Sequence, residues 1–513
     1  MAICQINKID SNITGLSFAE EECLKQLPSA PVWYALEPNS YSDFGGELST
    51  VARSPIDPSR QNKKGAITDL DASGGFNSDF TKSNLVALLQ GFFFADAREL
   101  PSTFPLNAAK IVVSKAEATS KTYTLASDGA KFVKGMLINA TGFANAGNNG
   151  VKTVVSSTAV AVVVSENLIE EASALAGARF NVVGRQFDAA DVSVAVVGNV
   201  VSLVATAADF TTMSELFPGQ WVFIGGDLAA NRFANNAGYA RIKSVSAKAI
   251  IFDDVTWQPV AEVGTGKSIR LFVGTVIRNE KLPNLIKRRS YNIERQLGEG
   301  MNGPQCEYLE GAVANEFTLN VPQGDKLNAD LSFIACDNTQ RSGDVGDEMK
   351  AGTRVAAPGE DAYNTSSDIY RIKMTVHDKT TSNPSALFGY VSESSISINN
   401  NVSPNKAVGV LGAFDTTAGN FEVGGSITAY FTTVSAVKAV RNNADVGLSI
   451  LGASKNAGFV FDIPLLGLGG GRLNVEKDAP ITVPLEPAGA ENENGYTMLY
   501  SYFSYLPTIA MPD

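Results

Sequence analysis

Short alternating segments separated by turn residues dominate this sequence and predict a chain built mainly of β-strands. Residues 47–53 alternate polar and apolar side chains with a period of two, which is typical of a half-buried strand. Residues 54–58 interrupt the pattern with two prolines, which cannot donate to a strand ladder, and residues 63–70 resume it. We therefore expect a long hairpin. Its polar tip carries three basic residues, which are the candidate residues for contacts between subunits or between rings of subunits: Arg60, Lys63 and Lys64.

Helical periodicity occurs in only two places. The first helix has an apolar stripe of Leu85, Leu88, Leu89 and Phe92, and Thr81 or Ser83 is expected to cap it. The second has valines on one face and is expected to end at residues 442–443. Each helix follows two strands, around residues 63–94 and 406–443. This repetition predicts two copies of one β-rich domain, each with a single helix packed against it.

Residues 110–268 have a different composition, rich in glycine, alanine, valine and asparagine, and contain an internal duplication. A phenylalanine-led turn at 132–135 and an asparagine-rich loop at 148–150 match residues 217–220 and 235–238. Strands follow the loop in both copies. The segment is therefore predicted to form two small β modules inserted into a larger domain.

Composition and charge restrict the function. The chain has 513 residues, 44% of them apolar, and a formal net charge of −12. This length predicts several domains, and the acidic balance argues against a nucleic-acid-binding surface, which needs clustered lysine and arginine. The single histidine, His377, excludes multi-histidine zinc sites, and we expect it to be a strand residue on the surface.

Three partial motifs for cofactors or metals are incomplete. Residues 264–268 resemble a phosphate loop, but Ala261 replaces a required glycine. Residues 69–74 begin like a calcium loop, but the twelfth position is Phe80 rather than glutamate. The glycines of 467–471 are followed by Arg472 and not by a helix. We therefore expect no catalytic residue, cofactor or metal.

Several short strings together resemble one protein family, the major tail tube proteins of long-tailed bacteriophages with flexible, non-contractile tails. The resemblance covers about 30–108 and 270–507, and the insert departs from it because minimal tube proteins lack such a segment. The matching strings lie at residues 33–38, 67–76, 88–93, 395–405, 407–414, 421–431 and 473–480.

This resemblance implies a structural protein and not an enzyme. In that family the tube domain is a β-sandwich with a flanking helix, and its inward strands join those of neighbouring subunits in a β-barrel around a channel. Rings of six domains stack into a tube, and a long loop reaches adjacent rings. The implied partners are further copies of the chain, the tape measure protein in the lumen, tail terminator and distal tail proteins at the ends, and genomic DNA in transit without sequence-specific binding. The resemblance also implies assembly in the host cytoplasm, location in the virion tail and no membrane anchoring.

Together these observations predict the following division of the chain. The segments are an irregular N-terminal segment 1–30, the first tube domain at 31–108 and 269–345, inserted modules at 109–190 and 191–268, and a second tube domain at 346–513. Two tube domains per chain favour a trimeric ring with pseudo-sixfold symmetry, and a hexamer is the competitor. The alternative function is another virion structural protein, such as a capsid or tail decoration protein.

Overall fold

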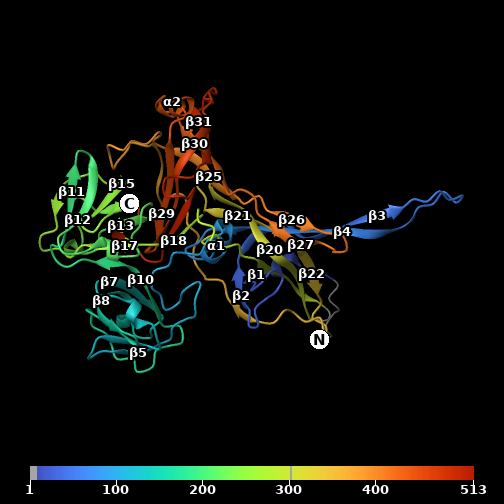
Figure 1. Ribbon diagram of the computed structural model, residues 1–513, viewed down its shortest axis with the longest axis horizontal. Helices are drawn as coiled ribbons and strands as arrows, with labels where there is room; N and C mark the ends of the chain where they lie inside the picture. Colours follow the sequence, from blue (N-terminus) through green and yellow to red (C-terminus); the bar gives the residue numbers. More distant parts are fainter. Residues whose placement is uncertain (1–7, 301–302, 513) are drawn as a thin grey trace.

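The computed structural model describes residues 8–300 and 303–512. The fold is mainly β, and the described residues contain two α-helices, α1 (Val86–Phe93) and α2 (Ser435–Arg441), at the two predicted places. Large antiparallel sheets form the body, and one long hairpin projects far from it (Figure 1). The predicted fold class, β-rich tube domains with flanking helices, is confirmed.

The body consists of two repeats with the same order of elements. In the first repeat, the elements in chain order are β1 (Gly15–Glu20), β3 (Pro38–Arg53), β4 (Lys63–Asp79), α1, β19 (Tyr291–Gly300), β20 (Gly303–Val321), β21 (Asn328–Ala335) and β22 (Asp337–Arg341). In the second, they are β24 (Ile369–Val376), β25 (Val391–Asn399), β28 (Glu422–Tyr430), α2, β29 (Val446–Ser454), β30 (Ala457–Gly470), β31 (Thr482–Gly489) and β32 (Leu499–Phe503).

Strand pairing shows that these elements are equivalent one by one. β1 pairs with β19, β19 with β20, β20 with β21 and β22, β21 with β4, and β4 with β3. The second repeat makes the same pairings in the same order, all antiparallel. Individual hydrogen bonds repeat as well, since the N–H of Phe80 donates to Leu327 O and that of Phe431 donates to Ile481 O, both at 2.9 Å.

The two repeats share one apolar core. Residues of both helices and of both sets of strands belong to a single buried cluster, in which the rings of Phe317 and Phe461 stack with centroids 6.1 Å apart. Ala436 and Ala439 of α2 are buried in the same cluster as the leucines of α1. Because the core crosses from one repeat to the other, the repeats are held in a fixed relation.

The inserted segment repeats its own topology. The first module is formed by β5 (Val113–Glu117), β6 (Thr122–Leu125), β7 (Met136–Thr141), β8 (Gly150–Thr158), β9 (Ala161–Val164) and β10 (Arg179–Gln186). The second is formed by β11 (Val192–Val197), β12 (Val200–Ala205), β13 (Trp221–Ile224), β14 (Gly238–Val245), β15 (Ala249–Val255) and β17 (Arg270–Val273). Both have the order first, second, fifth, fourth, third and sixth strand, which agrees with the predicted duplication.

A hydrogen-bonded carboxylate occupies the same place in both modules, buried at Glu171 and partly buried at Glu262. Glu171 accepts hydrogen bonds from the backbone N–H groups of Ala144 and Asn145 and from Asn148 Nδ2. In the second module, Glu262 accepts from the equivalent donors, which are the backbone N–H groups of Ala234 and Asn235 and Nδ2 of Asn236. Burial opposes ionisation, but these bonds outweigh it and hold the pKa of both carboxyls below their usual value.

Removing this anchor is expected to destabilise the module. In Glu171→Ala the donors of the asparagine loop lose their acceptor, and the free energy of unfolding falls by about 1–3 kcal/mol. Because the folded pKa is lowered, the stabilisation is complete above the pKa of the unfolded chain and disappears as the pH falls through the folded pKa. Thermal unfolding should therefore separate variant and wild type at neutral pH, and the difference should shrink as the pH falls through the folded pKa of Glu171.

The matched control for this test is the exposed carboxylate Asp188, whose ion pair with Lys134 Nζ is 3.5 Å long and solvated. Asp188→Ala should unfold like the wild type at every pH. An equal loss in both variants would show that Glu171 is not an anchor.

The inserted modules are attached firmly to the second repeat. A separate apolar cluster joins Trp221 and Phe223 of the second module to Val460 and Phe503 of β30 and β32. Beside it, Arg241 Nη1 lies 3.2 Å from the fully buried Asp462, and its Nε lies 2.8 Å from Asp253. β10 and β17 pair with each other, so the two modules also form one continuous sheet.

Three local predictions were wrong. Within the segment 1–30, predicted as irregular, residues 15–20 form β1, because β19 and β2 (Val32–Leu36) supply partners on both sides; residues 1–7 lie outside the described residues. Thr81 and Ser83 do not cap α1: both hydroxyls donate to Glu360 instead. Residues 47–53 are exposed on both faces because the hairpin extends beyond the strand that would cover it.

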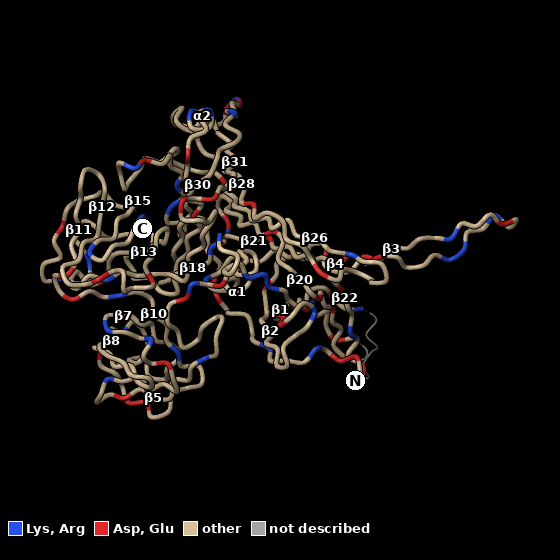
Figure 2. The backbone as a smooth tube through the Cα atoms, viewed as in Figure 1, with Lys and Arg blue, Asp and Glu red and all other residues tan. Residues whose placement is uncertain are grey.

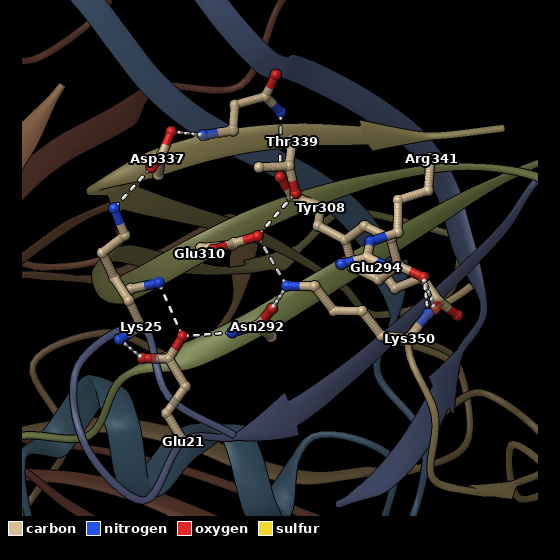
Figure 3. A network of polar contacts seen from close by, with 12 residues as sticks. Glu21, Lys25, Asn292, Glu294, Tyr308, Glu310, Asp337, Thr339, Arg341 and Lys350 are labelled. Atoms are coloured by element: carbon tan, nitrogen blue, oxygen red, sulfur yellow. Dashed lines mark hydrogen bonds and ion pairs between the residues drawn. The ribbon is translucent and has the colours of Figure 1, made fainter. Parts of the chain in front are cut away.

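A polar network around Glu21 and Lys25 fixes this part of the N-terminal segment against the body (Figure 3). The buried carboxylate of Glu21 accepts from the N–H of Gly311 and from the side chains of Ser290 and Asn292. Lys25 then reaches Asp337 on β22, with Nζ and Oδ2 2.6 Å apart. These contacts join distant parts of the chain, so no local pattern in the sequence indicates them.

Candidate functional site

The main feature of the body is a sheet that continues from one repeat into the other. Its spatial order is β3–β4–β21–β20–β25–β28–β31–β30. The junction is the ladder between β20 and β25, which runs in register from Glu316 opposite Asn399 to Val321 opposite Ser394. β20 belongs to the first repeat and β25 to the second, so the two repeats are joined edge to edge within one chain.

The two faces of this continuous sheet differ sharply in chemistry. One face points into the shared core with large apolar side chains. Its buried members include Phe76, Phe317, Leu319, Leu331, Ile396, Ile398, Val423, Ile427 and Leu485. This alternation is the pattern of a sheet that is covered on one side only.

The other face is polar, and every charged side chain on its strands is a carboxylate, with Lys326 of the turn before β21 paired to Asp79 at its edge. Serine, threonine, asparagine and glycine alternate with the core residues, and no lysine or arginine lies in the strand segments 38–42, 74–79, 316–321, 328–334, 391–399, 422–430, 465–470 and 482–488. The carboxylates on this polar face are Asp79, Glu316, Asp330, Glu393, Glu422 and Glu486. A face of this kind repels polyanions and binds no phosphate.

Amide side chains connect the strands across the polar face. Asn77 Nδ2 donates to Asn328 at 3.0 Å and to Asp330 at 2.7 Å, and Asn320 Nδ2 donates to the same two residues at the same distances. Across the junction, Asn399 Nδ2 donates to Glu316 at 3.0 Å. Because these side chains bond to one another, the surface presents few free amide donors.

Both ends of the continuous sheet have free edges. Within the described chain, β3 pairs only with β4, and residues 467–470 of β30 pair only with β31. Unpaired strand edges aggregate unless another strand or element covers them. By the equivalence of the repeats, the end of β30 corresponds to the end of β20, and β3 corresponds to β25. The free edges thus correspond to the two strand edges that the β20–β25 ladder joins inside the chain.

The predicted hairpin is formed by β3 and β4 and extends beyond β21 over residues 47–71, which we call the long arm. The structure brings Arg60, Lys63 and Lys64 together at its exposed end. Lys63 Nζ lies 3.5 Å from Asp57, whereas Arg60 and Lys64 have no ion pair within the described part of the chain. Charges of both signs therefore mark the far end of the long arm (Figure 2).

The remaining sequence motifs have structural explanations. Asp69 and Asp71, which resemble the start of a calcium loop, both bind Lys406. Among residues 8–300 and 303–512, no group of three or more potential metal ligands lies together. The glycines at 467, 469 and 470 form the free end of β30, and Gly471 directly follows it. Within the same described ranges, no helix is long and apolar enough to cross a membrane.

Sequence reasoning did not find the acidic face. A local signal exists in β21, where Asn328, Asp330 and Ser332 alternate with buried residues. The common orientation of eight such strands, however, depends on the pairing of segments more than 200 residues apart, such as Asp79 with Asn328.

Comparison with protein families gives one extended match. A family model described as phage tail tube protein matches residues 11–488, which include the first repeat, the insert and the second repeat up to β31. No curated protein matches the chain.

Proposed function

The chain belongs to the phage tail tube protein family, and from this premise we propose that three copies close into a ring whose wall is the continuous sheet. The family makes the protein a structural component of the tail tube. The observation that supports the finer proposal is the β20–β25 junction, which joins two equivalent repeats edge to edge within one chain. A ring of three such chains contains six repeats.

Ring closure uses the two free edges. The end of β30 in one copy pairs with β3 of the next copy, as β20 pairs with β25 within each chain. This geometry is head-to-tail and closes when the rotation per chain is one third of a turn. Closure leaves no unpaired edge in the wall, which is how a barrel solves the edge problem.

The polar face then lines the channel. Its carboxylates and hydrogen-bonded amides give a wall that genomic DNA passes without binding, and the tape measure protein occupies the same lumen before ejection. The tail terminator and distal tail proteins meet the last rings at either end. The inserted modules lie on the outside, because the apolar cluster that holds them is on the opposite side of β29, β30 and β32 from the shared core.

Electron microscopy of the purified chain tests this proposal. We expect rings or tubes with a central hole, and class averages with threefold symmetry and six similar units in the wall. If the particles lack a hole at every concentration, the proposal is contradicted. That result would favour the alternative function, a capsid or tail decoration protein.

We assign the long arm to contact between neighbouring rings. Deleting residues 58–64 removes its end, including Arg60, Lys63 and Lys64, but touches no residue of the shared core. We expect the deletion variant to form normal rings and much shorter tubes. Length distributions from negatively stained tubes provide the measurement, and tubes of wild-type length would show that the tip is an ordinary solvated loop.

A further inference from the structure

A second, shorter arm projects beside the long arm. It is formed by β26 (Ser403–Lys406) and β27 (Ala413–Thr417), which connect β25 to β28. It therefore holds the same position in the second repeat as the long arm does in the first. Both arms leave the same end of the continuous sheet (Figure 1).

The loop of the short arm is apolar and exposed. Val408 is fully exposed, about half of Val410, Leu411 and Phe414 is accessible to water, and the sequence from 407 to 412 has no polar side chain. An uninterrupted exposed apolar loop of this kind marks an interaction site.

The loop is held firmly. Lys406 binds Asp69 and Asp71 at the base of the long arm, and Arg288 Nη2 lies 2.7 Å from Asp415. The N–H of Ala413 also donates to Cys336 O at 3.0 Å. The apolar side chains are thus presented in a fixed position and do not fold back on the body.

A second exposed apolar patch lies at the other end of the second repeat. Its members are Val434 before α2 and three residues of the segment between β30 and β31, and they are between one third and about two thirds exposed: Val434, Leu473, Val475 and Ile481. β28 runs from the short arm at Glu422 to this α2-end patch at Tyr430. The arm and the patch therefore lie at opposite ends of the same strands (Figure 1).

The first repeat lacks a comparable apolar patch at the corresponding end of its strands. The tip of its arm is charged, and the turn between β20 and β21 contains Asp325 and Lys326, with Lys326 Nζ 2.7 Å from Asp79. Exposed large apolar side chains occur in both arms and in the α2-end patch, where they lie among Arg472, Glu476, Lys477 and Asp478, but residues 322–327 between β20 and β21 expose none.

We propose that the short-arm loop of one chain binds the α2-end patch of the second repeat of another copy, in the next ring of the tube. This inference rests on the proposed stacking of rings. Head-to-tail stacking brings opposite ends of the sheet together, and exposed apolar side chains that can cover the loop are present at this end of the second repeat but not in residues 322–327 of the first. The short arms consequently fix the rotation between rings at positions that repeat every third of a turn.

Substitutions on the two sides test the contact. The double variant Val408→Asp/Leu411→Asp and the single variant Val475→Asp are each expected to form rings of wild-type mass but tubes at least about tenfold shorter, because either change places a carboxylate in an apolar contact. The matched control is Leu228→Asp, an exposed apolar residue of the inserted module, which should form tubes of normal length.

Cysteine pairs identify the partner. In a Cys4→Ser/Cys23→Ser background, Val410→Cys combined with Val475→Cys should cross-link chains under mild oxidation, whereas neither single variant should. Normal tubes from both aspartate variants together with no cross-link would overturn the inference and leave the ring proposal standing. Loss of rings in Val408→Asp/Leu411→Asp would place the short arm within the ring and overturn it as well. A wild type that forms no rings would refute both proposals.

Discussion

We expect the Leu468→Pro chain to remain a monomer under conditions in which the wild type forms rings. Leu468 lies opposite Pro487 in the β30–β31 ladder, and proline has no N–H to exchange. This pair is therefore not hydrogen-bonded, and the N–H of Leu468 points toward the free edge. Proline at this position removes a donor from the edge that joins the next chain and not from the ladder inside the chain.

The control for this variant is Leu468→Ala, which loses the partly buried side chain but keeps the N–H. We expect it to form rings, with some loss of stability. Light scattering gives the mass of both variants, and circular dichroism shows whether they fold. Rings of normal mass from a folded Leu468→Pro chain would show that this edge does not join the chains.

The second large effect is expected from reversing charge on the polar face. The triple variant Glu316→Lys/Glu393→Lys/Glu486→Lys places lysines on β20, β25 and β31, and every one of these side chains is exposed in the isolated chain. Tubes of this variant should retain double-stranded DNA that the wild type releases. If about six phosphates are neutralised, the affinity should fall by about 10³ between 50 and 200 mM salt. Phage carrying the variant should adsorb normally but fail to deliver the genome.

The matched variant Glu316→Gln/Glu393→Gln/Glu486→Gln distinguishes the loss of carboxylates that repel DNA from the gain of lysines that attract it. It removes the same three charges but adds no cation, so its tubes should not retain DNA. Binding to purified tubes is measured with short labelled duplexes over a salt series. Equal retention by wild-type and lysine tubes would show that the polar face does not line the channel.

Local patterns in the sequence predicted the elements that depend on near neighbours. The leucine and phenylalanine stripe predicted α1, and the prolines at 55 and 58 between two alternating segments predicted the long hairpin. The insert duplication was also visible, because the loops at Asn148 and Asn236 keep the same residue types. The domain boundaries at 108, 190, 268 and 345 remain predictions.

Features that depend on distant pairing could not be predicted. β18 (Thr275–Arg278) follows the insert but pairs with β32 of the second repeat, more than 200 residues later. The short arm reads as a polar turn followed by an apolar string, and only the ion pairs of Lys406 show where that string points. The acidic face likewise exists only once eight strands take a common orientation.

The most direct test of the central claim is the mass of the assembled ring, measured by light scattering and checked by mass spectrometry under native conditions. Three chains of 54.2 kDa give about 163 kDa. We predict this mass for the smallest closed particle, with threefold symmetry in electron micrographs. A closed ring of six chains, or a stable monomer that never assembles, would contradict it.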